Sequence, residues 1–117
     1  MSTRKTPAES FWLMLVHLVP CVLCKHLGLK QESRTEAHHM KEGAGLSQRS
    51  QHTLVLALCW EHHHGPSGVE GLGTKGLYTR YKLDEIDLLA MTIEAVVEEL
   101  HKQGPLLQWT HYYSARR

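Results

Sequence analysis

The chain of 117 residues lacks several features that would assign it to a class of protein directly. Its three cysteines are an odd number, which does not fit a closed set of disulfides. Its apolar run from Phe11 to Val19 contains His17 and is far too short to cross a bilayer, so we expect no membrane contact. Internal repeats and low-complexity segments are also missing. We therefore expect one soluble domain over residues 1–117.

Charge of one sign is scarce as well, because the net charge is only +1. Residues 1–82 carry ten Lys/Arg against six Asp/Glu, whereas residues 83–117 carry three against six. The first part can attract phosphate, but its excess is too small to indicate nucleic-acid binding by itself. The second part has a net negative charge, and we expect it to serve as a structural scaffold.

The first half of the chain predicts one helix and two strands. Residues 8–19 favour a helix that Pro20 ends; its apolar residues occupy nearly every face, so it is buried all round or covers a partner. Residues 33–39 and 53–58 favour two strands separated by a polar loop. We expect the strands to pair as an antiparallel hairpin.

The second half predicts helices. Residues 60–64 can start a helix that a Gly/Pro/Ser segment interrupts, and residues 72–82 resume it. The clearest helix covers residues 84–103, with Asp84 and Asp87 as a variant of the capping box. Its predicted apolar face consists of Leu88, Leu89, Met91, Ile93, Val96, Val97 and Leu100.

The cysteines fall into two pairs at the spacing of metal ligands. Cys21 and Cys24 form one pair, Cys59 and His62 form the other, and 34 residues separate the pairs. A gap of two residues lets a turn aim both side chains at one ion, so the pairs together predict a tetrahedral Cys3His zinc site that staples the hairpin. Thiolates of this kind suit a reducing compartment. The alternative is that the cysteines are small buried hydrophobes and His62 belongs to a surface histidine run.

Ten histidines are the strongest signal in the composition, and several of them are adjacent. His38 and His39 end the first predicted strand, and His63 and His64 follow the second ligand pair. Neighbouring side chains on a strand point to opposite faces. One histidine of the first pair can therefore ligate a metal while the other faces a substrate.

These motifs together carry a family resemblance. Cys-x-x-Cys, then Ala37-His38-His39, then Leu58-Cys59-x-x-His62-His63 resembles the HNH, or His-Me finger, nucleases. Within that family the chain is most similar to the phage recombination-enhancement nuclease and its small prophage relatives, over roughly residues 20–90. The resemblance implies an α+β fold of the ββα-metal type, with the zinc-stapled hairpin and helix between flanking helices 8–19 and 84–103. It also implies a DNA endonuclease in the cytoplasm of a bacterial host, with a recombination protein as partner.

Carried over to this chain, the resemblance assigns catalytic roles to three histidines. His38 matches the first ligand of a catalytic cation, and His63 matches a second ligand at the start of a helix. His39 matches the general base that activates water, a task that suits an imidazole which is neutral near pH 7. The cation would stabilise the charge of the transition state and the leaving oxygen.

The third ligand of that cation is open. Relatives are expected to carry a histidine just before the Gly-Leu-Gly segment, where this chain has Glu70. The glycine-rich backbone of residues 65–73 can fold back toward the histidines. A carboxylate in such a site favours Mg²⁺ or Mn²⁺. His64 is the alternative ligand. Leu54 also stands where many HNH proteins have an asparagine.

Two further groups of residues bear on nucleic-acid binding, and one rival function remains. Basic side chains flank the predicted site and can contact phosphates: Arg34, Lys41, Arg49, Lys75, Arg80 and Lys82. The tail residues Trp109, Tyr112 and Tyr113 can stack on bases or pack as an arm. The rival is a non-catalytic zinc module that binds DNA or protein, and it requires one bound zinc ion where the nuclease requires a second metal.

Overall fold

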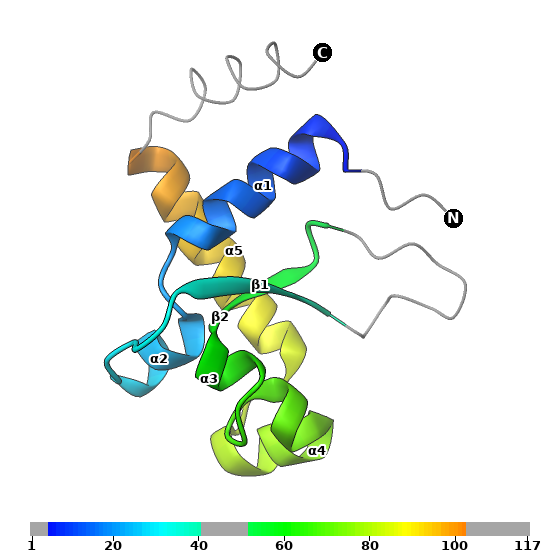
Figure 1. Ribbon diagram of the computed structural model, residues 1–117, viewed down its shortest axis with the longest axis vertical. Coiled ribbons are helices and arrows are strands. Elements are labelled where there is room, and N and C mark those ends of the chain that lie inside the picture. The colour runs from blue at the N-terminus through cyan, green and yellow to red at the C-terminus, as the bar shows by residue number, and fades with distance from the viewer. Residues whose placement is uncertain (1–4, 41–51, 103–117) are drawn as a thin grey trace, which may run out of the picture.

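Helices surround a single two-stranded sheet in the part of the chain that the computed structural model describes, residues 5–40 and 52–102 (Figure 1). This arrangement confirms the expected small α+β fold. The elements, in chain order, are α1 (Pro7–Leu18), α2 (Val22–Leu27), β1 (Thr35–His39), β2 (Val55–Cys59), α3 (Trp60–His63), α4 (Val69–Tyr81) and α5 (Glu85–Lys102).

The hairpin forms as predicted, although both strands begin two residues later than expected. β1 pairs with β2 antiparallel, with Thr35 opposite Cys59 and His39 opposite Val55. Every residue of β2 is buried, because β2 lies between β1 and α5. The backbone N–H of Ala57 donates to the hydroxyl of Thr92 at 3.1 Å, so a helix side chain satisfies an N–H of the covered strand.

Helix α1 begins at a capping box. The side chain of Thr6 accepts from the N–H of Glu9, and the carboxylate of Glu9 accepts from the N–H of Thr6. Leu15 and Val16 are buried against the sheet and α5. Of the two alternatives for this helix, burial on every face is wrong, because Met14 and Leu18 are 37% and 52% exposed, and the other, that it covers a partner, stays a prediction. Only one side of a helix can face a sheet that it covers.

The stretch Pro7–Leu27 is long and apolar enough, with a mean hydropathy of 1.5, to pass for a membrane-spanning helix. In this fold the extended backbone of Val19 divides it into α1 and α2, and half of the apolar window is buried. Helix α2 was not predicted, and it ends at Gly28, whose positive φ of 70° suits a residue without a side chain.

Helix α5 confirms the predicted cap and corrects the predicted apolar face. Asp84 and Asp87 exchange two backbone-to-carboxylate hydrogen bonds of 3.0 and 2.9 Å. Ile93 and Val97 are each 42% exposed, so their assignment to the core face is wrong. The stripe of residues that faces the sheet is narrower than the predicted apolar face. Its buried residues are Leu88, Thr92, Ala95 and Val96.

Candidate metal centres

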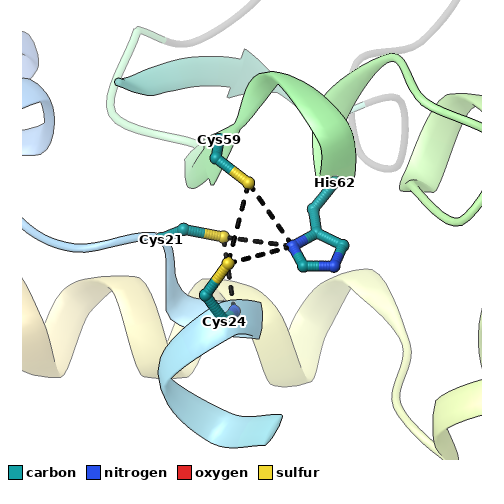
Figure 2. A group of neighbouring side chains, drawn as sticks. All are labelled: Cys21, Cys24, Cys59 and His62. Atoms are coloured by element: carbon teal, nitrogen blue, oxygen red, sulfur yellow. Dashed lines mark hydrogen bonds between the residues drawn. The ribbon is translucent and has the colours of Figure 1, made fainter. Parts of the chain in front are cut away.

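The four predicted zinc ligands meet at one point in the core (Figure 2). Cys21 and Cys24 come from the start of α2, Cys59 is the last residue of β2, and His62 lies in α3. All four residues are buried, with exposed fractions between 0% and 7%. Two segments far apart in the sequence are therefore joined at this cluster.

The distances within the cluster match a tetrahedral shell. The Nδ1 atom of His62 lies 3.5 Å from Sγ of Cys21, 3.4 Å from Sγ of Cys24 and 3.5 Å from Sγ of Cys59. The Sγ atoms of Cys24 and Cys59 are 3.7 Å apart, and the three cysteines are free thiols. A tetrahedral zinc ion gives S···S and S···N separations of about 3.8 and 3.6 Å, whereas a disulfide joins its sulfurs at about 2.05 Å. The cluster is thus compatible with structural zinc.

Polar contacts brace both ligand pairs. The N–H of Cys24 donates to Sγ of Cys21 at 3.4 Å, as expected where a helix begins at a ligand pair. The amide oxygen of Gln31 accepts from the N–H of Cys21 at 2.7 Å, and its amide nitrogen donates to Thr35 in β1. The hydroxyl of Ser33 accepts from the N–H of Trp60 at 2.9 Å. The loop between α2 and β1 therefore holds the two ligand pairs in register.

Burial dominates the electrostatics of the cluster. It raises the pKa of the Cys24 thiol, and the neighbouring thiols raise that pKa further. Burial likewise raises the pKa of Cys59 and lowers the pKa of His62. A neutral imidazole is the form that ligates a metal, and a dication would offset the cost of burying thiolates.

A second group of side chains that could hold a metal comes from β1, α3 and α4, and its His63 directly follows His62 of the first group. His38, His63 and Glu70 each offer a donor atom, and these atoms all lie within 4.8 Å of one another. Oε2 of Glu70 is 3.1 Å from Nε2 of His63 and 3.6 Å from Nδ1 of His38. The side chains of His38 and His63 are 5% and 12% exposed, and that of Glu70 is 42% exposed. The group is buried on the histidine side and open to solvent at the carboxylate.

The glycine-rich segment explains how Glu70 reaches the histidines. A Cβ atom on Gly68 would lie 2.5 Å from the carbonyl of His62, and one on Gly71 would lie 2.5 Å from the carbonyl of Gly65. Residues without side chains thus let the segment pack directly on the end of α3. The predicted fold-back of residues 65–73 is confirmed, and it places the first turn of α4 beside His63.

His64 takes a different place from Glu70. Its ring stacks on His63 with centroids 3.8 Å apart, and its Nδ1 lies 3.0 Å from Oε1 of Glu70. His64 forms a separate donor group with Glu36 and His63, and its side chain is 40% exposed. Of the two candidates for the third ligand, Glu70 is the one that meets both His38 and His63.

Two carboxylates that the sequence reasoning did not select complete the surroundings. Oε1 of Glu36 lies 2.7 Å from Nδ1 of His63, and Oε2 of Glu85 lies 3.5 Å from Nε2 of His38. Glu36 had a usable signal, because it stands two residues before His38 on a strand and so shares its face. Glu85 had no local signal, since it belongs to a helix 47 positions further along the chain.

Burial and hydrogen bonding set the charges of this second group. Burial lowers the pKa of His38, and the neighbouring His63 lowers it further, whereas Glu85 and Glu70 oppose the shift. The hydrogen bond from His64 is the main cause that lowers the pKa of Glu70. The shifts favour a neutral His38 beside an ionised Glu70, which are the forms that ligate cations.

His39 lies apart from both metal-ligating groups. Its Nε2 is 3.0 Å from Nδ1 of His52, which stands just before β2. Burial lowers the pKa of His39, with smaller contributions from His52 and Lys5. The structure therefore separates the two neighbouring histidines as the alternation of a strand predicts, and His52 is a partner that the sequence did not indicate.

Some of the predicted phosphate contacts and all of the predicted stacking residues fall outside the described part of the chain: Lys41, Arg49, Trp109, Tyr112 and Tyr113. Two of the remaining basic residues pack on aromatic rings. The guanidinium of Arg80 lies 5.6 Å from the ring centre of Tyr81, and the ammonium of Lys82 lies 5.7 Å from that of Tyr78. The packing leaves their charges available at the surface of α4.

Fold and site together define a small α+β protein with a buried Cys3His cluster that can bind a metal. Comparisons add no family to this description. No protein-family model matches the chain, and no curated protein or solved structure matches it significantly.

Proposed function

We propose that the protein is a metal-dependent DNA endonuclease of the HNH, or ββα-metal, type. The observation that carries this proposal is the convergence of His38, His63 and Glu70 next to a Cys3His cluster. The motif resemblance selects the two histidines as cation ligands and leaves the third ligand open between Glu70 and His64. In this proposal Mg²⁺ or Mn²⁺ binds the three side chains, and zinc binds the Cys3His cluster.

In the proposed reaction, His38, His63 and Glu70 would hold the divalent cation, which would supply stabilisation of the charge on the phosphate and on the leaving 3′ oxygen. His39 takes the proton from the attacking water, for which its lowered pKa keeps the ring neutral. His39 contacts His52 in the present geometry, so the ring has to present its other nitrogen to the water. Basic side chains such as Arg34 would hold the DNA backbone.

Cleavage of supercoiled plasmid DNA tests this function. We expect the zinc-loaded protein to nick or linearise the plasmid with Mg²⁺ or Mn²⁺ and to be inactive without a divalent cation. His39→Ala should remove the activity. A wild-type protein that carries its zinc and leaves the plasmid intact with both cations would contradict the proposal.

A non-catalytic zinc module is the second candidate. It is favoured by the ion pairs in which Glu36, Glu70 and Glu85 already partner the histidines, since a purely structural polar cluster would have the same contacts. The two candidates differ in metal content. The zinc module binds one zinc ion, and the nuclease binds one zinc ion and one exchangeable divalent cation.

A further inference from the structure

Each imidazole of the second group lies between Glu70 and one additional carboxylate. The ring of His63 has Glu70 3.1 Å from Nε2 and Glu36 2.7 Å from Nδ1. The ring of His38 has Glu70 3.6 Å from Nδ1 and Glu85 3.5 Å from Nε2. Glu70 is therefore shared by both rings, whereas Glu36 and Glu85 each approach one ring from its far side.

This arrangement has a consequence for the protons on the rings. A neutral imidazole carries one N–H, which donates, and one lone pair, which accepts or ligates. A carboxylate accepts only, and both nitrogens of each ring face one, so a cation on the Glu70 side would take the inner lone pair and leave the proton on the nitrogen that faces the outer carboxylate. A ligating histidine commonly donates its other N–H to a carboxylate, which fixes the ring and its tautomer.

The short contact between Glu36 and the ring of His63 indicates that Glu36 accepts a hydrogen bond from the ring and does not itself ligate a cation. A separation of 2.7 Å between a ring nitrogen and a carboxylate oxygen is that of a strong hydrogen bond. Each donor group has one partly exposed carboxylate, Glu36 at 36% and Glu70 at 42%, and both share His63; they differ in the second histidine, because the side chain of His64 is 40% exposed and that of His38 is 5% exposed. The observations favour a single cation on the Glu70 side, with Glu36 behind it.

We propose that Glu36 and Glu85 are positioning residues, which hold His63 and His38 so that Nε2 of His63 and Nδ1 of His38 face one divalent cation. Glu36 lies on β1 opposite Leu58, and Glu85 is the first residue of α5, so each is fixed by a regular element. The inference rests on the proposed function for the identity of the site. It adds the ligand atoms and the residues that orient them.

The first test reads the tautomers directly. The full chain, loaded with zinc and supplied with diamagnetic Mg²⁺, is labelled with ¹⁵N-histidine and examined by two-bond ¹H–¹⁵N correlation. We expect His63 as the Nδ1–H form and His38 as the Nε2–H form. Finding either ring mainly in the opposite tautomer would overturn the assignment.

The second test measures Mn²⁺ affinity by calorimetry on the zinc-loaded chain. Glu36→Ala and Glu85→Ala should each weaken Mn²⁺ binding by roughly 10- to 100-fold, as is typical for partners of ligating histidines. Glu36→Gln and Glu85→Gln keep an acceptor oxygen and should restore most of the affinity and the tautomer. Glu94→Ala, which removes an exposed carboxylate from the same helix as Glu85, is the charge-matched control and should bind as the wild type does.

Two outcomes of the calorimetry would contradict the positioning role of Glu36 and Glu85. If the alanine variants bind Mn²⁺ like the wild type, the two carboxylates do not position the rings. If glutamine is as harmful as alanine, the carboxylate itself ligates the cation and the positioning role is wrong. Neither readout requires DNA, so correct tautomers and Mn²⁺ binding without plasmid cleavage would refute the proposed nuclease alone, and cleavage with reversed tautomers would refute this inference alone.

Discussion

At the scale of single residues, the Cys3His cluster has no spare ligand among the described residues. Three thiols and one imidazole form a complete tetrahedral set in which every member is buried. A structural zinc ion stabilises a small domain because the unfolded chain holds no preformed site for it. The stability of the domain should therefore depend on each of the four side chains.

We expect Cys59→Ser to lose tightly bound zinc and to lower the free energy of unfolding by more than about 4 kcal/mol, a size that lost metals can reach. His26→Ala is the matched control, because His26 is an exposed residue of α2 beside Cys24. Elemental analysis and thermal unfolding measure the two effects. A correctly folded wild-type protein without zinc would contradict the account.

The second residue-scale prediction concerns the neighbouring histidines. His38→Ala should weaken binding of the second cation and reduce cleavage, because His38 contacts Glu70. His39→Ala should abolish cleavage and leave the affinity for that cation nearly unchanged, because His39 lies on the other side of β1 against His52. Calorimetry with Mn²⁺ gives the affinities. Equal losses of affinity in both variants would rule out this division of roles.

The third prediction decides between Glu70 and His64. Glu70→Gln should weaken Mn²⁺ binding and lower cleavage at limiting Mg²⁺ with little change in stability, since the side chain is 42% exposed and glutamine has nearly the same size. Glu70→His should keep activity and shift the preference toward softer ions such as Ni²⁺ or Zn²⁺. His64→Ala is the comparison and should have a smaller effect. If Glu70→Gln cleaves as fast as the wild type at limiting Mg²⁺, His64 is the better ligand.

At the scale of elements, the turn between α3 and α4 determines whether Glu70 reaches the histidines. Gly71→Ala would place a Cβ atom 2.5 Å from the carbonyl of Gly65, so the turn must open. We expect a loss of about 1–3 kcal/mol in stability and weaker Mn²⁺ binding, with zinc retained. Gly76→Ala, which lies beyond the kink at Gly73 in α4, would place a Cβ atom 3.0 Å from Cβ of Leu72; this contact needs a smaller shift, so the variant should lose less stability and keep its Mn²⁺ affinity. If Gly71→Ala binds Mn²⁺ as tightly as the wild type does, the turn does not determine whether Glu70 reaches the histidines.

The elements also show what a sequence can reveal about this fold. The hairpin, the cap of α5 and the two ligand pairs follow from local patterns, because alternation, capping and ligand spacing are short-range properties. The exposure of Ile93 and Val97 does not, since it depends on how α5 lies across β2. The contact of Glu85 with His38 and that of His52 with His39 also depend on tertiary packing, and no spacing rule predicts them.

At the scale of the whole molecule, helix α3 connects the two groups of side chains that could hold metals. His62 belongs to the Cys3His cluster and the next residue, His63, belongs to the group with His38 and Glu70. Losing the buried cluster should therefore disturb the open group as well. The reverse effect should be small, because no member of the second group belongs to the Cys3His cluster, which keeps its four ligands.

The central claim is that one chain holds two metal ions in chemically different sites, and metal counting tests it most directly. We predict one zinc ion per chain that survives dialysis, together with one exchangeable Mn²⁺ that binds the wild type. His38→Ala should keep the zinc and bind Mn²⁺ much more weakly, whereas Cys59→Ser should lose both. A wild-type protein that holds one zinc ion and binds no Mn²⁺ would contradict the claim and leave the non-catalytic zinc module as the better description.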